Sequence, residues 1–158
     1  MACDVEIDLP DEASTLKLGA ALSQFRGLIF LHGELGAGKT TLVRGYLQAL
    51  GHKGPVKSPT YTLIEPYEFA GERVLHLDIY RLGDPTELEY MGIRDDLGAG
   101  NTLLVEWPER AKGYLGQADI EIDLNYSDPG RKACVLVPDP ALREGLVQVI
   151  SSTQIRYE

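Results

Sequence analysis

Apolar and polar positions along this chain alternate between the two-residue period of strands and the wider spacing of helices. Residues 3–10 alternate acidic with apolar side chains and stop at Pro10, which predicts a strand with one buried face. Asp11 is a favourable N-cap for the helix predicted next, and Gly19 within that helix allows close packing. Residues 24–27 end the helix with a glycine. The chain therefore begins with a strand and a helix.

The next two elements enclose a glycine-rich segment. Residues 28–32 form an apolar run of strand length. Residues 41–50 carry Leu42, Tyr46 and Leu50 at helical spacing. A strand, a glycine-rich loop and a helix thus follow one another in the first third of the chain.

The rest of the chain continues as short strands and helices. The pattern predicts an extended segment at 63–69 that forms a hairpin with a strand at 73–81 through Gly71 and Glu72. A short helix from Asp84, a loop at 93–98 and a buried strand at 102–105 are predicted next. The chain then continues with a short helix at 109–115, hairpin strands at 118–125 and 131–138, and a helix at 140–150. No linker or internal repeat divides the sequence, which predicts one α/β domain over residues 1–158.

The glycine-rich segment, residues 33–40, fits the pattern G-x-x-x-x-G-K-[ST]. Its setting between a strand and a helix is the one that a phosphate-binding loop requires, because backbone N–H groups and the helix dipole then face an anion. We expect Lys39 to reach the β- and γ-phosphates and the Thr40 hydroxyl to ligate Mg²⁺. The neighbouring residues expected to bind ATP are Gly36, Ala37, Gly38 and Thr41.

Composition limits the classes of partner and the cellular setting. The chain has 158 residues, a formal net charge of −9 and 44% hydrophobic residues. This acidic balance argues against a broad nucleic-acid-binding face. No signal peptide or long apolar run is present, so we expect a cytoplasmic protein without a membrane segment. In that setting Cys3 and Cys134 are expected to be reduced thiols.

Two carboxylates follow predicted buried strands. Asp78 near the end of its strand is a candidate to hold Mg²⁺, directly or through water. Glu106 ends the strand at 102–105, where ligands bind in open α/β sheets, and is a candidate to orient water or contact the metal. Trp107 is placed to shield the site, with rim packing as the alternative. His76 is interpreted as a core histidine, with a part in shaping the site as the alternative.

Three further polar residues have both a functional and a structural interpretation. Ser58 and Thr60 flank Pro59 after the glycine-loop helix, where nucleotide-switch proteins sense the γ-phosphate. Ordinary turn chemistry at a strand edge explains the same residues equally well. Thr15 either contacts the nucleotide base or sugar or belongs to a plain helix start.

The motifs G-E-L-G-A-G-K-T-T, S-P-T-Y-T, H-L-D-I-Y-R and V-E-W-P-E-R, in this order, resemble those of the TsaE (YjeE) family. That family is the bacterial ATPase of tRNA threonylcarbamoyladenosine biosynthesis. The resemblance implies a P-loop NTPase-like three-layer fold with a mixed parallel and antiparallel sheet, binding of ATP or ADP with Mg²⁺, and slow hydrolysis. It also implies work with the TsaB–TsaD heterodimer on tRNAs that read codons beginning with A, without performing the transfer itself. Contact with tRNA would be indirect, and the chain alone is expected to be a monomer.

Carried over by position, the resemblance implies roles for individual residues. Lys39 and Thr40 would hold phosphates and Mg²⁺, and Glu106 would be a carboxylate on the metal side. Asp78 would support hydrolysis, and Thr15 would lie on the nucleotide side.

Other classes remain open from the sequence. A small nucleoside or nucleotide kinase also has a phosphate loop, but no arginine-rich lid segment is present here. A GTPase is disfavoured because no N-K-x-D guanine-reading motif occurs. A nucleotide-gated binding module with incidental hydrolysis is the non-enzyme alternative.

Overall fold

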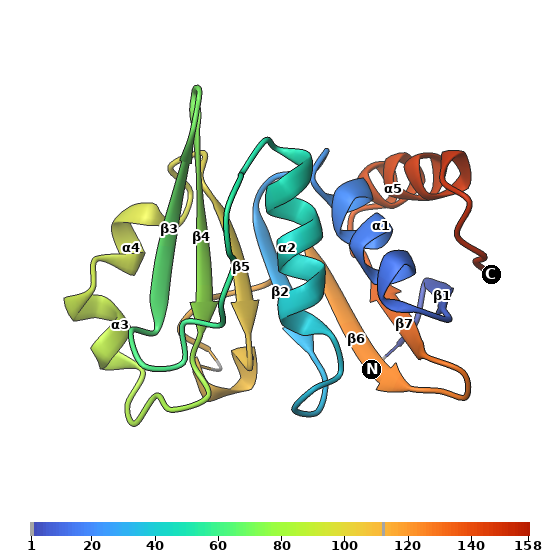
Figure 1. Cartoon of the computed structure of the whole chain (residues 1–158). Helices are drawn as coiled ribbons and strands as arrows, with labels where there is room; N and C mark the ends of the chain where they lie inside the picture. The colour runs from blue at the N-terminus through green and yellow to red at the C-terminus, as the bar shows by residue number, and fades with distance from the viewer. Residues whose placement is uncertain (1, 112) are drawn as a thin grey trace.

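The computed structural model describes residues 2–111 and 113–158 and contains a seven-stranded sheet covered by helices (Figure 1). The strands are β1 (Val5–Leu9), β2 (Leu28–His32), β3 (Ile64–Phe69), β4 (Glu72–Asp78), β5 (Thr102–Glu106), β6 (Ile120–Tyr126) and β7 (Arg131–Leu136). The helices are α1 (Glu12–Leu22), α2 (Lys39–Ala49), α3 (Thr86–Tyr90), α4 (Ile93–Asp96), a 3₁₀ turn η1 (Pro108–Ala111) and α5 (Pro140–Ser152).

The sheet is mixed, as expected, with strand order β1-β7-β6-β2-β5-β4-β3. Its centre is parallel, because β2 pairs with both β5 and β6 and β4 pairs with β5 in the same direction. Both flanks are antiparallel: β3 pairs with β4 on one side, and β6, β7 and β1 pair in turn on the other. Because these strands are parallel, the C-terminal ends of β2, β4 and β5 lie at the same edge of the sheet.

Side-chain alternation along the strands produces two apolar clusters, one on each face. Leu104 of β5 packs in the cluster that includes α1, α2 and α5. Its neighbours Leu103 and Val105 pack in the other cluster, which includes Leu88 of α3 and Ile93 of α4. The result is the expected three-layer arrangement, in which α1 and α2 lie side by side over one face (Figure 1).

Most element predictions are confirmed, and the differences are local. The 93–98 segment was expected to be a loop, but Ile93–Asp96 forms the short helix α4. Ile93 is fully buried, and Gly92 before it adopts a left-handed φ of 78°. Burial of Ile93 and the conformational freedom of Gly92 therefore allow a short helix to form although the segment is acidic. The helix expected at 109–115 is instead η1, and Lys112 lies outside the described residues. The hairpin turn precedes Glu72, which already belongs to β4.

Cys3 and Cys134 are paired as a disulfide, so the expectation of reduced thiols is wrong. Their Cα atoms lie 5.4 Å apart because β1 and β7 are antiparallel neighbours, with Glu6 opposite Cys134. The expected compartment carries no information on which strands pair, so it could not indicate that these two cysteines are neighbours. Among the described residues, no helix is both long and apolar enough to cross a membrane.

Candidate functional site

The glycine loop, residues 33–40, joins β2 to the start of α2 and lies at the edge of the sheet where the parallel strands end (Figure 1). Gly33, Gly36 and Gly38 have φ values of 143°, 81° and 108°, which side chains rarely adopt. Gly38 is the N-cap of α2, and no side chain caps it. The first-turn N–H groups of α2 therefore remain available to an anion.

Lys39 lies at the start of α2 and is 5% exposed. Its Nζ donates to the Gly33 carbonyl and lies 3.8 Å from the centroid of the Trp107 ring. Burial lowers the pKa of Lys39, while the negative charges of Glu106 and Asp78 act in the opposite direction. The ammonium group is thus held among neutral partners and two nearby carboxylates.

Asp78 and Glu106 are directly opposite each other at the ends of the parallel strands β4 and β5. Both are buried. Glu106 Oε2 accepts a hydrogen bond from Thr40 Oγ1 at 3.2 Å and lies 2.5 Å from His76 Nε2. Asp78 accepts bonds from Ser58 Oγ and from the Tyr80 backbone N–H, the latter at 3.2 Å.

The segment predicted to sense the γ-phosphate lies beside Asp78. Besides its bond to Asp78, Ser58 Oγ is 3.2 Å from Thr60 Oγ1. Leu63, which follows, has a φ of 67° and accepts the Asp78 backbone N–H at 2.9 Å. Trp107 has a φ of 60°, also in the left-handed region. Bulky residues avoid this region, so the two carboxylates are flanked by two strained backbone positions.

Most of the predicted site residues surround one cavity of about 280 Å³. Its lining includes Gly36, Gly38, Lys39, Thr40, Thr41, Ser58, Thr60, Asp78, Glu106 and Trp107. Thr15 and Ala37 do not line it. They line a neighbouring cavity of about 230 Å³, which shares Gly36, Gly38 and Thr41 with the first. The glycine loop therefore runs between two cavities, with Asp78 and Glu106 on one side and Thr15 on the other.

Two residues that the sequence analysis did not single out also reach the glycine loop. Arg131 of β7 donates from Nε to the Ala37 carbonyl and from Nη2 to the Gly36 carbonyl, each at 3.2 Å. Tyr126 of β6 donates its hydroxyl to the Leu35 carbonyl at 2.9 Å and stacks under Arg131. Nothing local in the sequence signals these contacts, because they depend on β6 and β7 lying next to β2.

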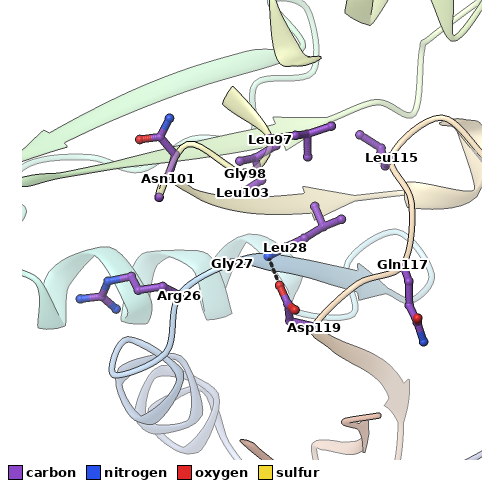
Figure 2. Close-up of a pocket in the computed structure, with 11 residues that line it drawn as sticks. Arg26, Gly27, Leu28, Leu97, Gly98, Asn101, Leu103, Leu115, Gln117 and Asp119 are labelled. Carbon is purple, nitrogen blue, oxygen red and sulfur yellow. Dashed lines mark hydrogen bonds between the residues drawn. The ribbon is translucent and has the colours of Figure 1, made fainter. Parts of the chain in front are cut away.

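A further cavity, of about 430 Å³, lies at the opposite edge of the sheet, where β2 and β5 begin (Figure 2). Leu28, Leu97, Leu103 and Leu115 contribute its apolar lining. Asp119 also lines this cavity, and its Oδ2 accepts a hydrogen bond from the Leu28 backbone N–H at 2.8 Å (Figure 2). None of the predicted site residues lines this cavity.

The strand order, the glycine loop before α2 and the three layers define an α/β protein with a P-loop NTPase-like fold. The family described as "Threonylcarbamoyl adenosine biosynthesis protein TsaE" matches residues 9–133. The chain therefore belongs to the TsaE family.

Individual relatives agree with this assignment. A tRNA threonylcarbamoyladenosine biosynthesis protein TsaE of Haemophilus influenzae is 43% identical over 152 residues, covering 91% of this chain and 96% of the relative. The protein of the same description from Aquifex aeolicus is 36% identical over 132 residues, covering 80% and 91%. The crystal structure of YdiB from Bacillus subtilis superposes with a TM-score of 0.75 at 23% identity, covering 96% of this chain and 97% of that one. The similarity to YdiB supports the assignment of the fold.

Proposed function

We propose that this protein binds ATP with Mg²⁺ and hydrolyses it slowly, as part of tRNA threonylcarbamoyladenosine biosynthesis. The observation that carries the proposal is the convergence of Lys39, Thr40, Asp78 and Glu106 on one cavity at the start of α2. A buried ammonium group, open helix N–H groups and two carboxylates are the parts that phosphoryl-transfer sites need.

The residues at this cavity fit magnesium by their chemistry. The Thr40 hydroxyl and the carboxylates of Asp78 and Glu106 are hard oxygen donors. Among the described residues, no group of three or more His, Cys, Asp or Glu could hold a metal by itself. Magnesium suits such a site, because it takes one or two carboxylates and completes its shell with phosphate and water oxygens. When bound, the ion would neutralise charge on the phosphates.

The two cavities beside the glycine loop support a division between the phosphates and the nucleoside. Lys39 and the first turn of α2 would bind the phosphates from one side. Thr15 and Thr41 line the other cavity, which would take the ribose and adenine. Arg131 keeps two glycine-loop carbonyls turned toward itself and so would hold the loop in shape for phosphates.

Hydrolysis requires a group that orients the attacking water. Glu106 is a candidate because its position is fixed by the end of β5 and by bonds to Oε2. Asp78 would support the reaction through its bonds with Ser58, which with Thr60 would respond to the γ-phosphate. Trp107 would cover the site and form part of the ATP-binding surface, since its ring already contacts Lys39.

The partner in this proposal is the TsaB–TsaD heterodimer, and contact with tRNA is indirect. The net charge of −9 supports weak affinity for bare tRNA, because phosphate backbones repel an acidic surface. We expect the ATP-bound form to associate best with the heterodimer, since the γ-phosphate can order the segment around Thr60. Salt-sensitive micromolar binding to bare tRNA would contradict this part of the proposal.

Nucleotide titration monitored by Trp107 fluorescence tests the binding step. We expect ATP and ADP with Mg²⁺ to bind more tightly than GTP. Lys39→Ala should weaken binding by roughly 30- to 1,000-fold, about 2–4 kcal/mol, because an ammonium paired with phosphate in a sheltered site is lost. Lys53→Ala is the matched control, since Lys53 is an exposed lysine outside the site. Equal affinity for GTP would refute the adenine assignment.

Turnover measured with the partner heterodimer tests the hydrolysis step. Glu106→Ala should lower the rate by roughly 10²-fold, about 2.7 kcal/mol of barrier, with little change in the affinity for ATP measured without metal. Thermal melting in parallel separates this role from a structural one. Normal turnover in a variant that merely melts earlier would remove Glu106 from the site.

A further inference from the structure

His76 is a buried polar residue to which the proposed function gives no role of its own. It lies on β4, two residues before Asp78, and is fully buried. Because side chains alternate along a strand, His76 and Asp78 point to the same face of the sheet. Leu104 and Glu106 of β5 stand opposite them in register, and Leu104 packs in the apolar cluster on the α2 side. His76 therefore lies just behind the carboxylates, on the face that α2 covers.

The contact between His76 and Glu106 is short and enclosed. Nε2 of His76 lies 2.5 Å from Oε2 of Glu106, and both side chains are almost completely buried. Nδ1 of His76 has no hydrogen-bond partner among the described residues. A proton on Nδ1 would therefore be buried without an acceptor, so the geometry assigns the proton to Nε2, which donates to the carboxylate.

Packing alone does not explain a histidine at this position. An apolar side chain of similar size would fill the space without leaving the ring nitrogen Nδ1 unsatisfied. The buried carboxylate of Glu106, by contrast, needs donors, and its Oε2 has two: His76 Nε2 and Thr40 Oγ1. Among the described residues no hydrogen bond reaches Oε1 of Glu106. The two donors thus hold one oxygen and leave the other for a ligand.

We propose that His76 is a positioning residue, which fixes the Glu106 carboxylate by a buried hydrogen bond to Oε2 so that Oε1 serves the nucleotide site. This inference rests on the proposed function, because it assigns a task to Glu106 at that site. His76 touches no substrate itself. It acts through Glu106, in the way that outer residues orient the ligands of metal and phosphate sites.

Three substitutions of His76 test the proposal. His76→Gln keeps an N–H that reaches toward Glu106, His76→Asn keeps a polar side chain that is too short, and His76→Leu removes the donor. We expect the Asn and Leu variants to lose about 10- to 100-fold in turnover and in the affinity of the ADP-loaded protein for Mn²⁺, read by electron paramagnetic resonance. The Gln variant should stay within about threefold of the parent protein, and metal-free ADP affinity should change little in all three.

A double-mutant cycle separates positioning from a general structural effect. In a Glu106→Ala background, adding His76→Asn should change turnover and Mn²⁺ affinity no further, because the carboxylate that His76 positions is absent. Additive losses would overturn the proposal. His52→Leu, a change at a histidine of the turn after α2, is the matched control and should leave both readouts unchanged.

The outcomes distinguish this inference from the proposed function. If the parent protein binds no ATP or ADP, the proposed function fails. If the parent protein binds and hydrolyses ATP while His76→Asn and His76→Gln behave alike, the inference alone is overturned. A His76→Leu variant that does not fold leaves the Gln and Asn comparison to decide.

Discussion

Lys39 shows how a single residue can be held ready for a ligand. Its ammonium group is buried, donates to the Gly33 carbonyl and faces the Trp107 ring. Burial lowers its pKa from the ordinary lysine value of 10.5, although Glu106 and Asp78 oppose the shift. A phosphate placed beside Lys39 would add negative charge and raise this pKa again.

Nucleotide binding should therefore take up a proton at alkaline pH. The affinity for ADP is expected to be highest below the lowered pKa of free Lys39. It should fall as the pH rises from that value toward the higher pKa of the complex, because free Lys39 must first be protonated. Calorimetric titration between about pH 7 and about pH 10 in buffers of different ionisation enthalpy measures both the affinity and the proton uptake. A Lys39→Met variant should bind weakly at all pH values, and a flat profile in the parent protein would contradict the expectation.

At the residue scale, the sequence located the positions whose placement follows from local spacing. Lys39 and Thr40 are placed by the motif itself, and Asp78 and Glu106 by being at the ends of apolar runs. Arg131 could not be found in this way, because its contacts to the glycine loop depend on how β7 is placed in the sheet.

At the scale of elements, α1 and α2 meet backbone to backbone. A Cβ on Gly19 of α1 would collide with the Leu42 carbonyl, and a Cβ on Gly45 of α2 would collide with the Leu16 carbonyl. This close approach brings Thr15 next to the glycine loop, with its Cγ2 3.7 Å from the place where a Cβ on Gly38 would lie. The helix contact thus helps to shape the second cavity of the site.

Gly19→Ala should destabilise the protein by about 1–3 kcal/mol or more, because the added methyl group forces the two helices apart. The denaturant midpoint in a chemical unfolding experiment measures this. Gly145→Ala in α5 is the matched control, since its new Cβ would meet only Phe25 at an ordinary 3.6 Å. The control should be neutral or more stable by up to about 1 kcal/mol, the usual gain of alanine over glycine in a helix. Equal losses in both variants would argue against the close helix contact.

At the scale of the whole molecule, both edges of the sheet are protected. β3 carries Pro66, Glu65 and Glu68, which discourage pairing with another strand. The free edge of β1 is covered by the C-terminal tail: Glu6 and Glu158 exchange backbone hydrogen bonds of 2.9 and 2.7 Å, and the Asp8 N–H reaches the Arg156 carbonyl at 3.0 Å. Sheet extension is therefore blocked on both sides.

Removing residues 156–158 should expose the β1 edge and cause concentration-dependent self-association, whereas the full chain stays monomeric. Light scattering after size-exclusion chromatography measures the mass. Replacing the same three residues by alanine keeps the backbone bonds and should leave the protein monomeric. Self-association of the alanine variant as well would show that side chains, and not the covered edge, keep the molecules apart.

The sequence pattern predicted the elements of the fold better than their arrangement. The apolar periods located nearly every strand and helix, because burial of one face leaves a local signature. Strand order leaves no local signature in the sequence. Pairing between distant segments decides that β6 lies next to β2 and that β1 lies next to β7. The Cys3–Cys134 disulfide escaped prediction for the same reason, as its two residues are 131 positions apart.

The pairing of β1 with β7 also determines when β1 can pair during synthesis of the chain. β1 leaves the ribosome before the other six strands, yet its hydrogen-bond partners are β7 and residues 156–158. At usual synthesis rates, roughly 10 s pass between the two events. During that interval Val5, Ile7 and Leu9 have no strand beside them. The β1 edge of the sheet can form only after β7 has emerged, so a ribosome that stalls before β7 would leave β1 without its partner strand.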